Sequence, residues 1–148
     1  MSPLPLWLGG ASKAAIRRTA RYGSGWLAPL QSPEESGRTV SAIREEAKRI
    51  GRPIPDDHYG ATIVFRIGDK PEAEAAANAE QSPERAAYAE RLRSIQAIGE
   101  PSDVLDRLRD FRGQGVTKFI AIPLARTTDE MIEQCRLLSR EVIPYAND

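Results

Sequence analysis

Apolar runs that alternate with amphipathic stretches set the pattern of this chain. The first run, Leu4–Leu8, leads into Gly9 and Gly10, and a helical pattern over Lys13–Tyr22 follows with Ser12 at the N-cap. A strand, a tight turn and a helix N-terminus are therefore predicted within a few residues. Because the run is almost continuously apolar, we expect this strand to be buried on both faces, as in a parallel sheet.

The same order of strand and helix recurs along the chain. Further strands are predicted at 25–30, 59–67 and 117–123, and the strand at 59–67 is rich in β-branched and aromatic residues. Further helices are expected at 33–50, 72–80, 82–98, 102–112 and 129–142. Ser32, Pro33 and Glu35 form a capping box with proline at N1, and Gly23 is expected at C′ of the first helix.

Apolar residues at helical spacing predict the buried face of each later helix. The residues expected to be buried are Tyr88, Leu92, Ile95, Val104, Leu105, Leu108, Phe111, Met131, Ile132, Cys135 and Leu138. A lone cysteine in such a pattern is expected to be a small core residue.

Four strands alternating with helices indicate an α/β fold with a parallel sheet of four βα units. The 148 residues fit a single domain. A (β/α)₈ barrel needs roughly 250 residues, so the chain would supply half of one. A small, open, doubly wound sheet is the competing architecture.

The amino-acid composition argues against several classes of binding partner. The 21 basic and 21 acidic residues balance, so nothing favours nucleic acid or an anionic membrane. No apolar run approaches the roughly 20 residues of a transmembrane helix, and no signal peptide is recognisable. One histidine and one cysteine exclude a His/Cys metal cluster within one chain. We expect a soluble, cytoplasmic protein without a metal site.

The double-glycine corner is the main candidate for chemistry. Gly9 and Gly10 let the backbone turn and approach a ligand without Cβ clashes. The helix that follows directs its unpaired N–H groups and positive dipole end to the same place, which suits a phosphate. A plain βα turn that uses glycine only for chain reversal is the alternative.

Two blocks of the sequence resemble the bacterial luciferase-like family of flavin- and deazaflavin-dependent oxidoreductases and monooxygenases. The first comprises Pro5–Ser12, Ala15 and Arg21–Leu27, and the second comprises Ile98–Val104, Leu108 and Gly115–Ile120. They occur in the family's order and span nearly the whole chain. The resemblance covers the C-terminal half of the family's barrel, and Ser24 stands where many members carry Asp.

The resemblance implies a half TIM barrel of luciferase-like type that binds FMN or coenzyme F420, a deazaflavin, at its C-terminal mouth. The cofactor phosphate would lie at the turn formed by Gly9, Gly10, Ser12 and Lys13. Substrate would lie near Pro29, at the end of the second strand, and near Arg126, after the last one. Arg126 as a solvated loop residue is the alternative. No catalytic residue is assigned, because the cofactor carries the chemistry in such enzymes.

Other notable residues have simpler interpretations. His58 follows Asp56 and Asp57 and is expected in a surface loop, with a general base as the alternative. Trp7 and Trp26 are expected in the core.

Two further hypotheses stay open for the chain as a whole. A non-catalytic half-barrel would self-associate or pair with an N-terminal half, because open sheet edges bind other strands. The second hypothesis is that the chain is an inactive remnant of such an enzyme, with an anion site that stays vacant.

Overall fold

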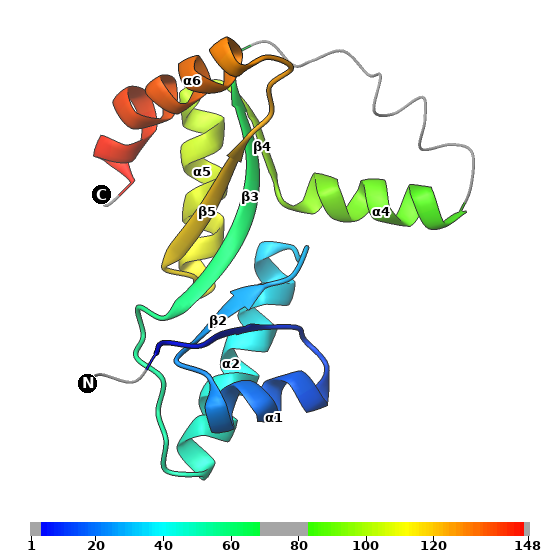
Figure 1. Cartoon of the computed structure of the whole chain (residues 1–148), viewed down its shortest axis with the longest axis vertical. Coiled ribbons are helices and arrows are strands. Elements are labelled where there is room, and N and C mark those ends of the chain that lie inside the picture. The colour runs from blue at the N-terminus through cyan, green and yellow to red at the C-terminus, as the bar shows by residue number, and fades with distance from the viewer. Residues whose placement is uncertain (1–3, 69–82, 147–148) are drawn as a thin grey trace. The chain divides into compact units, whose positions relative to one another are not determined.

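A computed structural model describes residues 4–68 and 83–146 of the chain (Figure 1). The helix predicted at 72–80 and the first residue of the helix predicted at 82–98 lie outside the described residues. None of the helices in the described part combines the length and apolar character that a membrane span needs.

The chain divides into two compact units. Unit 1 contains the chain up to Thr62 together with Phe111–Ile120, and unit 2 contains Ile63–Asp110 together with the chain from Ala121. The strands β3 (Tyr59–Ile67) and β5 (Lys118–Pro123) contribute residues to both units.

Unit 1 is built on parallel strands. The strand β1 (Trp7–Gly9) pairs in parallel with β2 (Gly25–Ala28), and β2 pairs in parallel with the first residues of β3. β1 is shorter than predicted, and it is half-buried rather than buried on both faces. Leu4 and Leu6, which were predicted to be strand residues, are exposed and precede it.

Two amphipathic helices complete the βα units of unit 1. The helix α1 (Lys13–Tyr22) begins after the Ser12 N-cap as predicted, and α2 (Pro33–Arg49) begins with the full capping box. Gly23 ends α1 with a φ of −73°, so it caps the helix in an extended rather than a left-handed conformation. The core of this unit includes Trp26, Val40, Ile43, Tyr59, Phe111 and Val116, all fully buried.

Unit 2 contains a strand that the sequence pattern did not predict. The helix α4 (Pro83–Ser94) is followed by the strand β4 (Gln96–Gly99), which pairs in parallel with Val64–Ile67 of β3. Ile95, Ala97 and Gly99 are buried while the residues between them are half-buried, so the pattern has the period of a strand. The helix predicted at 82–98 therefore ends early, and Tyr88 is exposed rather than buried.

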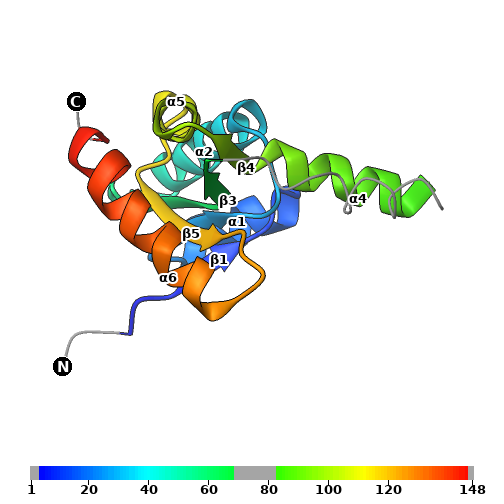
Figure 2. The same ribbon diagram turned by 90° about the horizontal axis from the view of Figure 1, so that it is seen from above.

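The chain closes with α5 (Pro101–Gly113), β5 and α6 (Thr128–Leu137). It leaves β5, turns through a short loop and enters α6 (Figures 1 and 2). A π-helical turn (Leu138–Val142) and a 3₁₀ turn (Ile143–Tyr145) follow.

The buried face of α6 differs from the prediction. Cys135, Met131 and Ile132 are exposed, and Gln134 is buried. The Gln134 side chain accepts a 2.7 Å hydrogen bond from the N–H of Ile67 and donates a 3.0 Å bond to its carbonyl. These two bonds join the side chain of Gln134 to the backbone of the last residue of β3. They therefore fix which face of α6 is buried.

The strand order confirms the predicted fold class. The strands pair in the order β1-β2-β3-β4, and β5 also pairs with β3, which makes five strands in place of the four predicted. The chain is an α/β protein of βα units, and its fold is a partial TIM barrel.

Candidate functional site

The corner between β1 and α1 has the geometry that the sequence predicts for a ligand turn. Gly9 is the last residue of β1 and is paired with Leu27 of β2, so the corner follows the carboxyl ends of two parallel strands. Gly10 has a φ of +101°, and a Cβ at this position would lie 2.9 Å from the Cβ of Ala15. Position 10 therefore requires glycine for both its backbone conformation and its space.

The first turn of α1 leaves hydrogen-bond donors open. The Ser12 hydroxyl accepts a bond from the N–H of Ala15, and the Ser12 carbonyl accepts one from Ile16. Within the described ranges, the N–H groups of Lys13 and Ala14 have no acceptor. The Ser12 hydroxyl also keeps its own proton to donate, since it acts only as an acceptor in this cap.

A tryptophan holds the corner from the side of β2. The indole N–H of Trp26 donates a 3.0 Å hydrogen bond to the carbonyl of Gly10. Trp26 is completely buried, which confirms its prediction as a core residue. The bond directs the carbonyl oxygen of Gly10 toward Trp26, so the negative end of this carbonyl does not repel an anion at the corner.

The electrostatics of α1 also favour an anion. The first turns of α2, α4, α5 and α6 each contain at least one acidic residue, whereas that of α1 contains none and begins with Lys13. In the described part of the chain, α1 is thus the α-helix whose positive dipole end no carboxylate of its own first turn offsets. Lys13 is exposed and adds a positive charge at the corner.

The sequence of this region decides the family. A family model described as luciferase-like monooxygenase matches residues 1–90, which is more than half of the chain and includes the whole corner. The chain belongs to the luciferase-like monooxygenase family. Ser24, the departure from the family pattern, exchanges bonds with Leu6: its hydroxyl accepts from the N–H of Leu6, and its own N–H donates to the Leu6 carbonyl.

Solved structures share the fold of this luciferase-like chain. The coenzyme F420-dependent tetrahydromethanopterin reductase from Methanopyrus kandleri superposes with a TM-score of 0.67 at 18% identity, over 96% of this chain and 51% of the reductase. The oxygenating constituent of 3,6-diketocamphane monooxygenase from Pseudomonas putida, in complex with FMN, gives a TM-score of 0.67 at 11% identity, over 94% and 48%. The chain therefore spans about half the length of these proteins.

A curated sequence also matches part of the chain. The threonine–tRNA ligase of Synechococcus sp. (strain CC9902) is 35% identical over 63 residues, which cover 40% of this chain and 10% of the ligase. The match is confined to a short segment, so it carries no argument about activity.

The predicted substrate residues do not lie together in either unit. Pro29 is exposed just after β2 in unit 1. Arg126 is exposed in unit 2, in the loop after β5. In the luciferase-like chain, the residues predicted to bind phosphate all lie at the β1–α1 corner. The substrate role of Pro29 and Arg126 stays a prediction.

The loop around Arg126 is held by side chains of unit 2. The carboxylate of Glu130 accepts a 2.6 Å bond from the N–H of Arg126 and forms an ion pair with Arg66 at 3.6 Å. Arg66 also donates a 3.0 Å bond to the carbonyl of Leu124. The bond from Arg126, followed by the charge of Arg66, lowers the pKa of Glu130. The loop after β5 is therefore held by the carboxylate of Glu130, a residue of the helix that follows it.

Chemical groups also gather before the strands of unit 1. The ring of His58 contacts the Ser24 carbonyl at 2.7 Å through Nδ1, and it lies 5.6 Å from the Trp7 ring. Lys118 pairs with Asp57 at 3.1 Å and thereby lowers the pKa of that carboxylate. His58 is half-buried rather than on a free surface loop, and Trp7 is also half-buried. Because these groups lie at or just before the first residues of the strands, their place is typical of stabilising rather than catalytic residues in a barrel.

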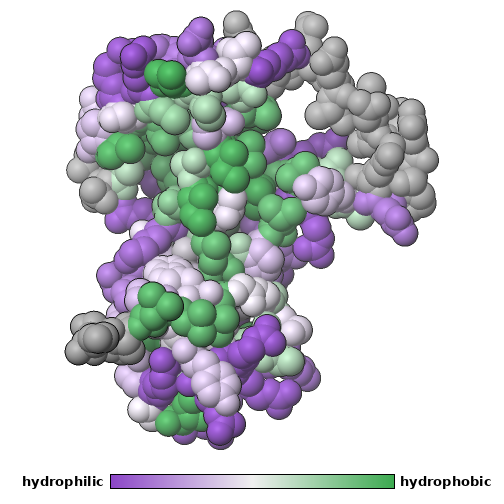
Figure 3. Space-filling view, in the orientation of Figure 1, coloured by the Kyte–Doolittle hydropathy of each residue, from purple (hydrophilic) through white to green (hydrophobic). Residues whose placement is uncertain are grey.

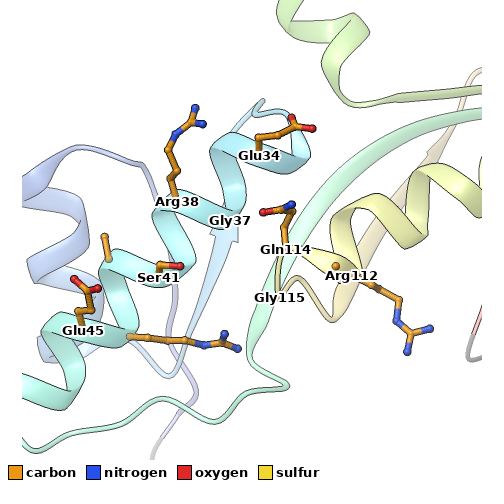
Figure 4. Close-up of a pocket in the computed structure, with 11 residues that line it drawn as sticks. Glu34, Gly37, Arg38, Ser41, Glu45, Arg112, Gln114 and Gly115 are labelled. Atoms are coloured by element: carbon orange, nitrogen blue, oxygen red, sulfur yellow. The ribbon is translucent and has the colours of Figure 1, made fainter.

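A polar groove of 760 Å³ lies between α2 and the turn after α5 (Figure 4). Gln114 points across it toward Gly37, where a Cβ would meet the Gln114 amide oxygen. Arg44 lines the groove and pairs with Asp56 at 3.0 Å. Since the carbonyl end of α5 faces the groove and both charge signs line it, the groove lacks the character of an anion site. Within the described ranges, no three potential metal-binding side chains come together.

The sequence missed two residues that shape these sites. Trp26 was expected only to fill the core, and nothing local indicates that its N–H reaches Gly10. Glu130 lies three residues after the Thr127 N-cap, and this spacing is a recognisable capping-box signal.

Proposed function

We propose that residues 1–148 form one domain, the C-terminal half of the barrel of a cytoplasmic luciferase-like oxidoreductase or monooxygenase. In this proposal the chain binds the phosphate of FMN or coenzyme F420 at Gly9, Gly10, Ser12 and Lys13. Family membership and the solved structures of F420-dependent and FMN-bound proteins support the choice of cofactors.

The observation that carries the proposal is the open N-terminus of α1. The N–H groups of Lys13 and Ala14 lack acceptors in the described residues, and no acidic residue stands in that turn. The turn follows the carboxyl ends of β1 and β2, where ligands bind in parallel α/β folds. A phosphate there would receive backbone N–H bonds and interact favourably with the helix dipole.

Each residue of the corner has a separate role in this proposal. Gly9 and Gly10 bring the backbone close to the phosphate without Cβ atoms, and the Ser12 hydroxyl donates a further hydrogen bond. Lys13 supplies a positive charge. The bound cofactor supplies the redox chemistry, and the protein supplies its position. Pro29 and Arg126 are proposed to contact substrate.

The test compares two flavins that differ by the phosphate. FMN and riboflavin are titrated against the chain, and binding is followed by flavin fluorescence. We expect FMN to bind more tightly by about tenfold or more, because charge-assisted hydrogen bonds to a phosphate contribute roughly 1.5–3 kcal/mol. Equal affinity for the two flavins would overturn the phosphate assignment.

Lys13→Glu is the sharpest variant. It places a carboxylate in the first turn of α1, where the helix dipole favours it by about 0.3–1 kcal/mol, so the fold is expected to be as stable as before. The preference for FMN over riboflavin should nevertheless fall. Arg18→Glu makes the same charge change on an exposed residue of α1, beyond its first turn, and should keep the preference.

A parallel titration with coenzyme F420 decides between the two cofactors. Tighter binding of F420 than of FMN, lost in Lys13→Glu, would assign the deazaflavin. A folded chain that binds neither cofactor would overturn the proposal and favour a non-catalytic half-barrel.

A further inference from the structure

We propose that the exposed face of α1 binds a chain of carboxylates that continues from the phosphate at the β1–α1 corner. This inference rests on the proposed function and names the class of cofactor that the corner holds, one that carries further anionic groups beyond its phosphate. Coenzyme F420 has a chain of glutamate residues there, whereas FMN ends at its phosphate. The charges of α1, their lack of counter-ions and the direction of the helix carry the inference.

All charged residues of α1 are basic, and all of them are exposed. They are Lys13, Arg17, Arg18 and Arg21. The opposite side of the helix is buried through Ala15, Thr19 and Ala20. Hydrophilic side chains, drawn in purple, gather over α1 in the space-filling view (Figure 3). The helix therefore presents a cationic face to solvent.

These cations lack the counter-ions that other basic residues have. Within residues 4–68 and 83–146, none of the four takes part in an ion pair, whereas arginines of α2, β3, α5 and α6 do. The charge of Arg17 acts on Glu46 of α2, but two bonds from Arg49, at 2.7 and 2.8 Å, already hold that carboxylate. The positive charge of α1 is thus available to an external anion.

The two units of the chain differ in charge in the same sense. Unit 1, which contains α1, has nearly twice as many lysine and arginine residues as aspartate and glutamate residues. In unit 2 the acidic residues outnumber the basic ones by half. The balanced charge of the whole chain therefore hides a basic unit, and a basic surface attracts an anionic ligand and raises its rate of association.

The stability of α1 does not explain its row of basic residues. Lys13, Arg17 and Arg21 follow one another at intervals of four residues, and like charges at this spacing destabilise a helix. A cation in the first turn is also disfavoured by the positive end of the helix dipole. Exposed residues that cost stability are typical of a functional surface.

The row begins at the corner and leads away from it. Lys13 is the first residue of α1, next to the proposed phosphate site, and Arg21 is in its last turn. The helix of 10 residues is about 15 Å long, and the three cations are spaced by about 6 Å along its axis. Carboxylates repeated along a flexible chain can meet such a row one after another. A nucleic acid duplex presents a much longer line of phosphates than one short helix can neutralise.

The binding of two forms of the deazaflavin to the full chain tests the inference. Coenzyme F420 with its glutamate chain is compared with the same molecule truncated after the phosphate, and binding is followed by cofactor fluorescence. We expect the complete cofactor to bind about tenfold more tightly in low salt, and this advantage to shrink as added salt screens the exposed charges. Arg17→Glu and Arg21→Glu should each remove most of the advantage without changing the affinity for the truncated form.

Control variants separate the basic face from net charge and from folding. Arg109→Glu makes the same charge change on an exposed residue of α5 and should keep the advantage. Arg17→Glu places a glutamate four residues before Arg21, an order that stabilises helices, so this variant should fold as well as the wild type. Arg17→Gln only removes the charge and should give a smaller loss of the same kind. Equal affinity for the two forms, or an advantage that both glutamate variants of α1 leave intact, would overturn the inference.

A fluorescent peptide of five glutamates tests the basic face without the corner. Its binding is measured by fluorescence anisotropy, with a peptide of five glutamines as the control. Binding that Arg17→Glu weakens about threefold or more would support the basic face as a carboxylate site even where FMN and riboflavin bind equally and the phosphate corner fails. A glutamate peptide that binds no better than the glutamine peptide would overturn the inference, even where the corner holds FMN. Tighter binding of an oligothymidylate of the same charge would overturn the choice of carboxylates.

Discussion

The two junctions at which β1 leads into α1 and β5 leads into α6 use the same local cap but differ in charge. Ser12 and Thr127 each accept a bond from the N–H three residues later. At the second junction the Glu130 carboxylate accepts a bond from the N–H of Arg126, whereas the first turn of α1 contains no acidic residue. The first turn of α6 therefore carries acidic residues of its own, whereas the first turn of α1 carries none, so the two helix N-termini differ in charge.

The comparison sets a junction that side chains hold in place against the corner that we propose as the phosphate site. The β5–α6 junction is held by side chains: Arg66 and Glu130 fix the loop, and Gln134 fixes the helix. The β1–α1 junction is shaped by glycine and by one bond from Trp26. The β5–α6 junction is therefore fixed by side-chain contacts, and the β1–α1 junction has a helix N-terminus whose first turn carries no acidic residue. The predictions below test this division.

Gln134→Leu should have the largest effect on stability. Leucine fills a similar volume but leaves the buried N–H and C=O of Ile67 without partners, which should cost about 2–4 kcal/mol of unfolding free energy. Urea unfolding measures the change. Gln114→Leu, at an exposed position, is the matched control and should change little. A loss in Gln134→Leu no larger than in the control would show that these bonds do not hold α6.

Gly10→Ala should have the next largest effect. The positive φ strains alanine, and its Cβ would lie 2.9 Å from that of Ala15, so we expect a loss of about 1–3 kcal/mol. Gly51→Ala is matched in strain, with a φ of +70°, but its Cβ meets nothing within 4 Å. Urea unfolding of both variants isolates the contact at the corner. If Gly51→Ala loses as much, the packing of the corner is not special.

Ser12→Ala and Thr127→Ala should each lose about 1 kcal/mol, as is usual for an N-cap. The two variants should differ in binding. Only Ser12→Ala should lower the affinity for FMN, because only its hydroxyl can donate to the phosphate. A parallel FMN titration measures this difference, and an equal affinity in both variants would contradict the division between the junctions.

Local signals predicted the elements that local interactions define. The bounds of α1 and β3 match the predictions to the residue, because the Ser12 cap and the run of β-branched residues act within a few positions. The double-glycine turn was predicted for the same reason, since its conformation depends on its own glycines.

The contacts that the sequence did not reveal join distant residues. Leu92 and Ile95 share a helical spacing, yet β4 forms because Gln96–Gly99 pairs with β3. Cys135 was predicted to be buried. The bonds of Gln134 to Ile67, 67 positions away, instead bury the Gln134 side of α6 and leave Cys135 exposed. Such pairings are decided by tertiary structure and cannot be read from a short window of sequence.

The smallest predicted effect concerns pH and the closed junction. The N–H of Arg126 and the charge of Arg66 lower the pKa of Glu130 in the folded chain. A carboxylate with a lowered folded pKa stabilises the protein above its unfolded value, near 4.5, and this contribution is lost as the pH falls through the folded pKa. Thermal unfolding between neutral pH and about pH 3 should therefore show a steeper acid loss in the wild type than in Glu130→Gln. Glu133→Gln, on the same helix, should keep the wild-type slope. An unchanged slope in Glu130→Gln would mean that this carboxylate does not stabilise the β5–α6 junction, and the contrast with α1 would rest on the glycine corner alone.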